Sequence, residues 1–535
     1  MIFAGTMPTV ALVATATLML AVTPGSAKEA GAGPKAVTED TMEISVTIDR
    51  GTDLGQCFGS LYEARTSDNS FAIGAGFPNA YNTRYRADRH AVQFFVRPTD
   101  GKRKFDAEPL PRPNRLCGAY LYGREDVVYS TYDGNKTWDS GARSWHPAEN
   151  VGGTDETMRV GNSVLTFGNS TVLLNGKTIL PPPDRGSYQL FFYANGHLCF
   201  YHVNRGKGGY RPYENDGNGF SKLYACPWTP DDGQVDPTKA IVLTLPVVGE
   251  TTFAWGQLGD QIVTGSNIGG FYVFEDGRWT MLRKPVLTVS FQLYSTMMFR
   301  DRLIMGQYPT GRLFEYDGKT LVDLPGWPPC LDGVSRSSRE AQTTVIYGGD
   351  LFVGVWPWGE LWRYNPDSEV WAFASRMFKH PDLSDQITHP YDVETAEAKG
   401  KVGNQWGQRV TSLVTSGPHL FVSTSAKWPC PWDAKAFPFL SPDLWESYGT
   451  VHRASMSGHL GAPTKWTDAP TELTFTFSGS DVTIKQDGTL LAHTALPEPL
   501  ADRLEAAGGL KDIRWGTGIY GRFGGRKIQG SVRRR

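Results

Sequence analysis

The sequence predicts an all-β fold assembled from repeated small sheets, and three observations lead to that prediction. The 535 residues include 60 Gly and 35 Pro, about 18 % of the chain against an average near 12 %, and both residues are costly inside helices. Hydrophobic residues make up 40 % and aromatic residues 12 %, so the chain can bury a large core. Short strands bounded by glycine also recur at a regular spacing.

The recurring unit is clearest in the middle of the chain. Each copy is a strand ending in Gly, a short loop with a second Gly, an alternating strand, and a turn rich in Asp, Asn and Gly. The clearest copies cover 260–279, 302–318 and 350–367, and their equivalent glycines at 265, 306 and 354 lie 41 and 48 residues apart. Periods of about 40 to 50 residues with several short strands per unit are typical of β-propeller blades. We therefore expect a β-propeller.

Weaker copies on both sides bring the number of candidate units to eight. Two of them, near 126 and 163, are short enough for one to be half a blade, so we expect seven blades over residues 42–470, with eight as the alternative. The longest insertions fall at 77–90, 202–221, 375–408 and 425–448.

Both ends of the expected ring need a partner. Residues 42–48 alternate as an N-terminal strand that completes the last blade would, and 471–535 predict a small C-terminal extension. The extension contains a hairpin with a tight turn at Asp487 and Gly488 and a short helix over 499–510. It either finishes the final blade or forms an appendage.

The N-terminus reads as a targeting segment. An apolar stretch from Val10 to Val22 precedes small residues at Gly25 and Ala27, which predicts a signal peptide, residues 1–27, cleaved after Ala27. It is too short to span a bilayer. No Lys or Arg precedes Lys28, so a disordered or anchored N-terminal segment is the alternative. We expect 28–41 to be a flexible leader, and the mature chain to be secreted or periplasmic with no membrane span.

Six cysteines without any C-x-x-C pair argue against a zinc ribbon. Disulfides are permitted in an exported protein. Cys199 and Cys226 are the best local candidates because their strand-like runs could be neighbours across a long hairpin. Six buried thiols are the alternative.

The charges of the chain nearly cancel, with 53 Lys and Arg against 55 Asp and Glu. No overall positive field is present to hold a phosphate backbone. We therefore expect no nucleic-acid partner.

One short motif resembles a known family. Residues 131–138, T-Y-D-G-N-K-T-W, resemble the Asp box of sialidase-like propellers, with Asn135 where Gly is usual; Asn tolerates the left-handed conformation expected there. In that family the box is a structural turn far from the chemistry, so the resemblance implies fold and not activity. The sialidase catalytic set has no match, since residues 95–98 have the wrong order for F/Y-R-I-P.

More loosely, an exported propeller with a long first insertion is similar to the β-propeller polysaccharide lyases and related glycosidases. Ulvan-type lyases of that group carry a His pair about twenty residues apart, and no two histidines here have that spacing. The resemblance implies a glycan partner.

Propeller ligands bind where loops converge over the central channel. Exposed aromatic rings beside Arg and His suit an anionic sugar, because rings stack on the sugar and guanidinium groups hold a carboxylate or sulfate; the alternative is that these rings plug blade junctions. The expected binding residues are Tyr81, Tyr85, Tyr308, Trp356, Trp358, Trp406 and Trp428, with Trp432 beside them.

Two chemistries fit such a surface. β-Elimination of a uronate chain needs a cation on the carboxylate, a base and an acid, and is the first expectation; its candidate catalytic residues are His90, His202, Tyr201, Arg205, Arg86 and Arg409. Hydrolysis of sialidase-like type would need paired carboxylates, chiefly Glu340 and Glu446. A non-catalytic propeller that binds a glycan or a protein is the further alternative.

No cofactor is expected from the sequence. His389, Asp392 and Glu394 could ligate a cation such as Ca²⁺, but no calcium motif is present and a solvated loop is the alternative.

Overall fold

The computed structural model describes residues 41–55, 59–78, 80–82, 85–86, 88–149, 157–206, 212–214, 218–399, 404–467, 469–516 and 528–534. The predicted signal peptide lies outside the described residues, as does the predicted leader apart from residue 41. The description below concerns the unit Ala36–Arg535.

Of the residues that the structure describes, 53 % lie in strands and 6 % in helices, so the predicted all-β class is confirmed. Most strands form antiparallel sheets of four, built largely from strands consecutive in sequence. The first three are β8 (Leu121–Arg124), β9 (Val127–Ser130), β10 (Lys136–Asp139) and β11 (Ser144–Pro147); β12 (Thr157–Val160), β13 (Ser163–Phe167), β14 (Val172–Leu174) and β15 (Lys177–Leu180); and β16 (Ser187–Ala194), β17 (His197–Asn204), β19 (Phe220–Pro227) and β20 (Ile241–Thr244). A two-stranded ladder joins β18 (Tyr213–Glu214) to β21 (Val247–Val248).

Four further sheets follow along the chain. They are β22 (Thr252–Leu258), β23 (Gln261–Ser266), β24 (Phe271–Glu275) and β25 (Arg278–Arg283); β26 (Gln292–Phe299), β27 (Arg302–Tyr308), β28 (Leu313–Tyr316) and β29 (Leu321–Leu324); β30 (Glu340–Tyr347), β31 (Asp350–Trp356), β32 (Glu360–Asn365) and β33 (Val370–Arg376); and β34 (Arg409–Ser416), β35 (His419–Ser425) and β36 (Val451–Ser455), completed by β7 (Asp106–Leu110).

The seven sheets pack in series like propeller blades. At six of the junctions, two neighbouring sheets share an apolar cluster. The series begins at the sheet β12–β15, continues through the later sheets in chain order to the sheet of β34–β36, and ends at the sheet β8–β11. Between β8–β11 and β12–β15 the described contact is ionic, with Arg159 3.8 Å from Glu125. The predicted propeller type is confirmed.

The repeat glycines explain the sequence period. Gly265, Gly306 and Gly354 occupy equivalent places in the second strands β23, β27 and β31, each paired with the start of the third strand. A Cβ at any of the three would clash with the first strand of the next sheet. The spacing seen in the sequence therefore marks the points at which one blade packs against the next.

An N-terminal strand completes the last sheet, but it is β7 and not Met42–Ile48. β7 pairs with β36 as the outer strand of its sheet, an edge position that tolerates Pro109. Met42–Ile48, which is β1, lies instead between two C-terminal strands of another sheet. Alternation shows that a strand has one buried face, and it does not identify the partner.

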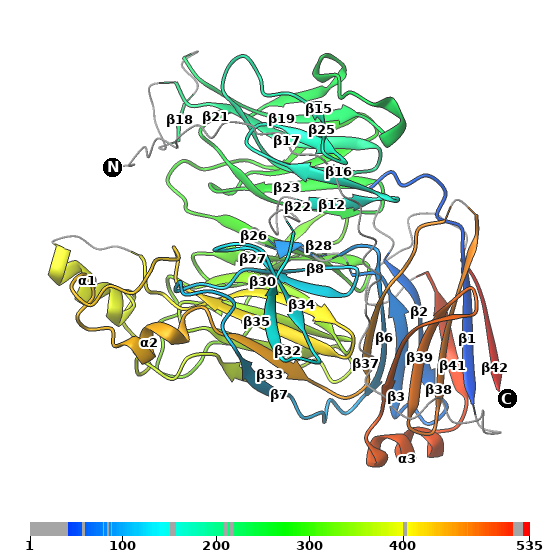
Figure 1. The fold of residues 1–535 in the computed structure, drawn as a ribbon. Coiled ribbons are helices and arrows are strands. Elements are labelled where there is room, and N and C mark those ends of the chain that lie inside the picture. The colour runs from blue at the N-terminus through cyan, green and yellow to red at the C-terminus, as the bar shows by residue number, and fades with distance from the viewer. Residues whose placement is uncertain are drawn as a thin grey trace, which may run out of the picture. The chain divides into compact units, whose positions relative to one another are not determined.

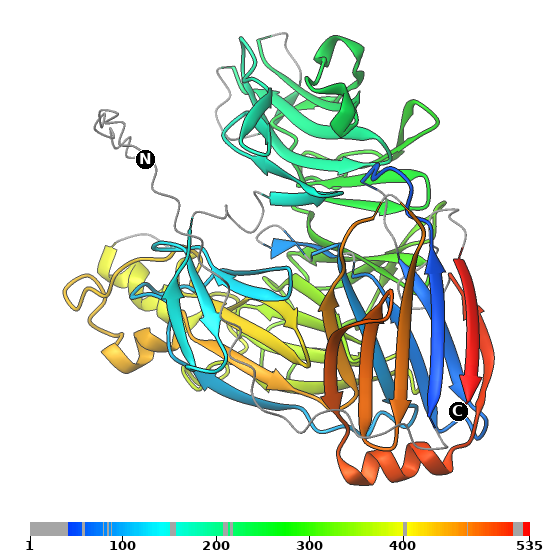
Figure 2. The ribbon, with the colours of Figure 1, turned by 45° about the vertical axis from the view of Figure 1, so that its right-hand side comes forward.

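Apart from β4 and β5, described below, the remaining strands form two five-stranded sheets. One has the order β40 (Thr489–Ala495), β39 (Asp481–Gln486), β38 (Thr471–Ser478), β1 and β42 (Ile528–Arg534). The other has the order β37 (His459–Pro463), β6 (Ala91–Pro98), β3 (Phe71–Gly76), β2 (Ser60–Thr66) and β41 (Leu510–Trp515). A single apolar core joins them, so they make a β-sandwich, with α3 (Glu498–Ala506) packed on it. Figures 1 and 2 show N-terminal blue strands beside C-terminal orange and red ones.

The propeller is an insertion within this sandwich, because β6 pairs with β37 although the seven sheets lie between them in sequence. The expected hairpin is present as β38 and β39, joined by the turn at Asp487 and Gly488 to β40, and the expected helix is α3. These C-terminal elements belong to the sandwich and do not finish the final blade.

A short hairpin from the sandwich enters the ring of blades. β4 (Ala80–Asn82) pairs with β5 (Tyr85–Arg86) and also with the inner strand β26. Tyr81 packs edge-on against Phe192 of β16, 5.9 Å between centroids, and the Asn82 side chain accepts a hydrogen bond from the Thr344 backbone N–H of β30 at 3.1 Å. One strand thus touches the inner strands of three blades, which is possible only near the ring axis.

We call base the end of the propeller that carries the turns between first and second strands. The Gly196 N–H there donates to the Leu54 carbonyl at 2.7 Å, and the Gly348 N–H donates to His459 Nδ1 at 3.1 Å. Both partners belong to the sandwich or the segment leading into it. The base is therefore the end on which the sandwich sits.

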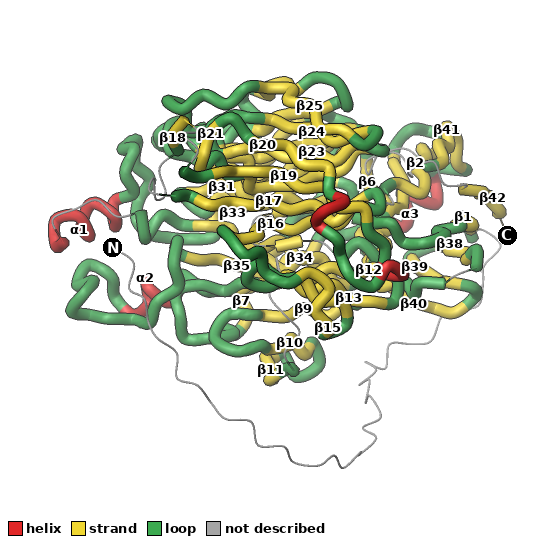
Figure 3. The backbone as a smooth tube through the Cα atoms, turned by 90° about the horizontal axis from the view of Figure 1, so that it is seen from above, coloured by secondary structure: helices red, strands yellow, loops and turns green. Residues whose placement is uncertain are grey.

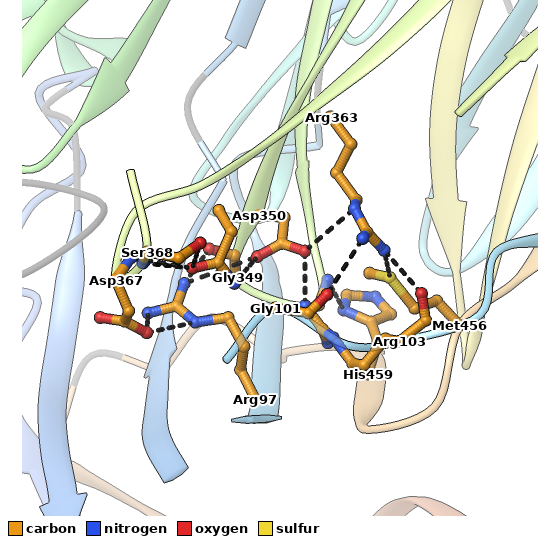
Figure 4. A network of polar contacts seen from close by, with 12 residues as sticks. Arg97, Gly101, Arg103, Gly349, Asp350, Arg363, Asp367, Ser368, Met456 and His459 are labelled. Atoms are coloured by element: carbon orange, nitrogen blue, oxygen red, sulfur yellow. Dashed lines mark hydrogen bonds and ion pairs between the residues drawn. The ribbon is translucent and has the colours of Figure 1, made fainter. Parts of the chain in front are cut away.

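A buried charge network holds this junction (Figure 4). Asp350, fully buried at the start of β31, lies 2.7 Å from Arg103 and 3.9 Å from Arg97 of β6. Arg363 of β32 lies 3.7 Å from the same carboxylate, and Arg97 also pairs with Asp367 at 2.7 Å. Charges this deep are stable only when paired, so the network fixes the sandwich to the blade.

The opposite end, which we call the loop face, carries the connections from second to third strands and from one sheet to the next. Two of its insertions contain helices, α1 (Pro390–Lys399) and α2 (Pro442–Ser447), and Figure 3 shows both at the same side, away from α3. Among the described residues, no helix is long and apolar enough to cross a membrane.

Candidate functional site

Four of the expected site residues lie together at the loop face. They are Tyr308, Glu340, Trp356 and Arg409, and we call them the Glu340 cluster. Glu340 opens β30 opposite Trp356, which ends β31. Arg409 Nη2 donates to Glu340 Oε2 at 3.3 Å, and the Tyr308 ring lies 6.3 Å from the Trp356 ring. Burial, with a smaller effect of Glu340, raises the pKa of Tyr308.

Three members of the Glu340 cluster, Glu340, Trp356 and Arg409, are buried but incompletely paired. Glu340 Oε1, Arg409 Nε and Nη1, and Trp356 Nε1 have no hydrogen-bond partner within the described residues. All three side chains are at least nine-tenths buried. Polar atoms left in this state are costly, and they mark a place where water or a ligand group could be held.

Next to this cluster the side chains of the loop face contact one another closely. Arg339 pairs with Glu360 at 2.9 Å, and Glu360 also accepts from Trp362 Nε1 at 2.7 Å. Trp358 is only 1 % exposed, and the guanidinium carbon of Arg376 lies 5.3 Å from the centroid of its ring. The prediction that Trp358 is an exposed binding residue is wrong, because this ring fills the space beneath the insertion.

Trp406 is also buried. Its ring is 0 % exposed and packs against Phe437 and Tyr448 at 4.7 and 5.5 Å between centroids. It forms the core of the two insertions rather than their surface, so the prediction of an accessible Trp406 is wrong as well. Aromatic content alone does not separate a ring that supports a loop from one that the loop presents.

Trp428 and Trp432 are two exposed rings of the loop face, and we call them the Trp pair. They are 57 % and 42 % exposed, in the loop between β35 and β36. Trp432 Nε1 donates to the Leu440 carbonyl at 3.3 Å, and Gln405 Nε2 donates to the Trp428 carbonyl at 2.5 Å. Lys427 Nζ lies 4.7 Å from the Trp428 ring centroid. The pair is therefore held in place while its rings face water.

The candidate catalytic histidines lie in separate places. His90 is 1 % exposed and its Nε2 donates to Asp53 Oδ2 at 3.1 Å, beside Trp466. His202 Nε2 donates to the Arg185 carbonyl at 2.8 Å among aromatic rings. Burial lowers the pKa of His90 to about 4 and also lowers that of His202. No described contact joins the two.

The other catalytic candidates whose side chains the structure describes do not gather around either histidine. Tyr201 is buried and donates to or accepts from Ser221 at 3.0 Å, and burial raises its pKa. Arg205 Nη2 lies 3.4 Å from Thr251 Oγ1, and Arg409 belongs to the Glu340 cluster. The hydrolytic carboxylates are also apart, since Glu340 is buried and Glu446 is exposed on α2.

The first insertion, residues 77–90, makes contacts near the axis of the propeller and is not an open loop in its described part. Tyr81 is 3 % exposed, and Tyr85 and Arg86 form β5, whose backbone pairs with β4; their side chains lie outside the described part of the structure.

The three suggested cation ligands lie in different environments. Asp392 Oδ1 accepts the backbone N–H groups of Gln405 and Trp406 at 2.7 and 2.9 Å, His389 packs 5.0 Å from Trp358, and Glu394 is exposed. Within the described ranges no three His, Cys, Asp or Glu side chains gather as metal ligands would.

The Asp-box-like segment forms the connection between β9 and β10. Positive φ angles occur at Asp133 (64°) and Gly134 (86°) and not at Asn135. The expected left-handed position is thus shifted along the turn.

A hollow of about 510 Å³ lies on the sandwich, lined by Glu63, Arg65, Asn69, Asp512 and Arg514. Its walls come from β2, β41 and one turn, so a ligand there would be held from one side. It shares no residue with the loop face.

Sequence reasoning missed the partners that shape the site: Lys427, Arg339, Glu360 and Arg376. Only Lys427 carried a usable signal, a cation directly before an aromatic residue inside a long insertion.

Neither family models nor curated proteins give a match to this chain. Among solved structures, the chain is similar to the computationally designed protein Ika8 (12 % identity, 76 % of this chain, 100 % of that one, TM-score 0.34). It is also similar to YCF48 bound to D1 peptide (12 %, 65 % and 96 %, TM-score 0.31) and to BamB from Moraxella catarrhalis (12 %, 77 % and 97 %, TM-score 0.30).

Proposed function

We propose that this chain is an exported, non-catalytic propeller that binds an acidic glycan on its loop face through the Trp pair and Lys427. The base carries the sandwich, so the loop face is the end left for a partner. The predicted signal peptide supports the exported part of the proposal.

The exposure of the Trp pair carries the proposal. Large apolar side chains exposed to water mark an interaction site. Here the Trp428 carbonyl accepts a hydrogen bond from the Gln405 side chain, and the Trp432 indole N–H donates to the Leu440 carbonyl. A ring that is already fixed loses little conformational entropy on binding. The faces of both indoles can stack on the C–H surface of a sugar, and Lys427 adds the positive charge that a uronate or sulfate requires.

Binding is favoured over elimination because the candidate acids and bases do not converge. A general base must reach the proton that it removes, yet His90 and His202 are enclosed by Asp53 and by aromatic rings respectively. Neither borders the Trp pair in any described contact.

The test is calorimetric titration of the purified chain with polygalacturonate, alginate and chondroitin sulfate. We expect one of these probes to bind, and the double variant W428A/W432A to weaken that binding at least tenfold, about 1.4 kcal/mol. Phe373→Ala is the matched control, since Phe373 is 43 % exposed on β33, and it should bind like the parent.

Equal binding by W428A/W432A and the parent would overturn the assignment of the site, and no binding of any probe would overturn the glycan proposal. Ultraviolet absorbance of unsaturated products in the same mixtures should stay flat. A steady rise would show an elimination reaction and replace the non-catalytic proposal.

A further inference from the structure

Two cysteines from distant parts of the sequence meet at the loop face. Cys117 lies just before β8, and Cys430 lies in the loop that carries the Trp pair. Their sulfur atoms are 3.4 Å apart across a sequence separation of 313 residues.

The backbone around the two thiols is already held in register. The Cys117 N–H donates to the Cys430 carbonyl at 3.1 Å, and the Ala426 N–H donates to the Cys117 carbonyl at 2.9 Å. The Cys430 N–H donates to Cys117 Sγ at 3.1 Å. A disulfide bond is about 2.05 Å long, so a small side-chain rotation would close the gap without a change of fold.

The other described cysteines lack such a partner. Cys199 and Cys226 sit on adjacent strands, but the register pairs Cys199 with Ala225 and Cys226 with Leu198. Their side chains therefore enter different apolar clusters on opposite faces of the sheet, so the predicted Cys199–Cys226 disulfide is wrong. Cys330 Sγ contacts carbonyl oxygens of its own loop at 4.0 Å.

We propose that Cys117 and Cys430 form a disulfide when the chain enters an oxidising compartment. The bond ties the approach to the β8–β11 sheet to the loop of the β34–β36 sheet. It fixes the loop that presents Trp428 and Trp432. The bond itself stands on the thiol geometry, and only its effect on glycan affinity rests on the proposed function.

The chemistry balances with a small-molecule disulfide as the oxidant. Cys430, the more accessible of the two, loses its proton to water, attacks the oxidant as a thiolate and releases one small thiolate. Cys117 then gives its proton to that thiolate, attacks Cys430 Sγ and expels the second small thiolate, which takes up the proton that Cys430 lost. Two protein thiols are oxidised and one small disulfide is reduced to two thiols. The contact with Cys430, together with burial, raises the pKa of Cys117, which agrees with this order of attack.

The experiment is equilibration of the purified full chain with a glutathione buffer, alkylation of remaining thiols, and mass spectrometry of the digest. We expect a cross-linked peptide containing Cys117 and Cys430, and two more alkylated thiols after reduction. The control C199S/C226S should retain the cross-link. Reduction should lower the melting temperature of the parent by at least ~2 °C and leave that of C430S unchanged.

Full alkylation of Cys117 and Cys430 in the oxidised sample, or a cross-link from either one to a different cysteine, would overturn the proposal. The parent protein alone decides this outcome, so a variant that fails to fold leaves the test intact. A cross-link without glycan binding would leave the disulfide established and reject only the glycan proposal. Glycan binding with both thiols alkylated would do the reverse.

Discussion

The two ends of the propeller hold their buried charges differently. At the base, both oxygens of Asp350 accept hydrogen bonds, from Arg103 at 2.7 Å and Asn365 at 3.3 Å. At the loop face, Glu340 has one oxygen paired with Arg409 and one without a described partner. Each carboxylate is buried beside arginine, so burial alone does not distinguish them.

The difference separates a structural charge from one available for interaction. A carboxylate with all its partners supplied by the protein is already as stable as its surroundings allow. A buried carboxylate with one unpaired oxygen has lost its hydration there without gaining a hydrogen bond, which lowers the stability of the fold. The first kind is expected at a fixed junction between sandwich and blade, and the second at a face that meets water or a partner.

The strongest test of this comparison is removal of Asp350. Asp350→Ala leaves the guanidinium groups of Arg97, Arg103 and Arg363 without their shared carboxylate, and should lower the free energy of unfolding by about 3–5 kcal/mol. Urea denaturation measures this loss. A change below about 1 kcal/mol would show that the network does not stabilise the junction.

Removal of one partner at the loop face should be repaired by removal of the other. Arg409→Met strands Glu340 and should cost about 3 kcal/mol, whereas E340L/R409M should recover at least about 1 kcal/mol of that loss because no buried charge remains. Denaturation of the two variants side by side measures the recovery. If the double variant is the less stable, the pair is a structural element like the base network.

Acidification should weaken the base through His459. Burial, with a smaller effect of Arg103, lowers the pKa of His459 to about 3 from its ordinary 6.5. Between these values the unfolded chain binds the proton and the folded chain does not, so stability falls as pH decreases from 6.5 toward 3, by about 1.4 kcal/mol per pH unit for this group. His459→Gln should reduce the slope of stability against pH in that window. An unchanged slope would contradict the assignment.

The smallest effect is expected for an exposed ion pair of the loop face that lies outside the Glu340 cluster. Arg312 and Asp323 lie 3.0 Å apart and are 47 % and 42 % exposed. Arg312→Ala should change the free energy of unfolding by less than about 0.5 kcal/mol. Thermal unfolding measures it, and a larger loss would mean that exposure is a poor guide to which charges matter here.

The blade repeat was predictable because its cause is local. Gly265, Gly306 and Gly354 recur where the next sheet packs, so the period in the sequence is a packing period. The partner of Met42–Ile48 was not predictable, because alternation defines a face and its neighbours, β38 and β42, lie more than 400 residues away. Pairing over such distances leaves no local trace.

The site was predicted only in outline, for a similar reason. Tyr308 and Trp356 do lie together and Trp428 is exposed, but Trp358 and Trp406 are buried. Loop residues of one type serve both as supports and as contact points. Which role a ring takes depends on what the insertion folds over, and this information is spread across segments such as 376–408 and 426–448.

The insertion of the propeller between β6 and β37 has a consequence for biosynthesis. Strands β1, β2 and β6 emerge early from the ribosome, while their C-terminal partners β38, β41 and β37 follow only after more than 350 further residues. The N-terminal strands must therefore wait with an unfilled apolar face while the blades fold. Such a delay leaves the edges of these strands unpaired and prone to aggregation. Substitutions in the N-terminal strands should therefore lower the yield of folded protein more than they lower its free energy of unfolding.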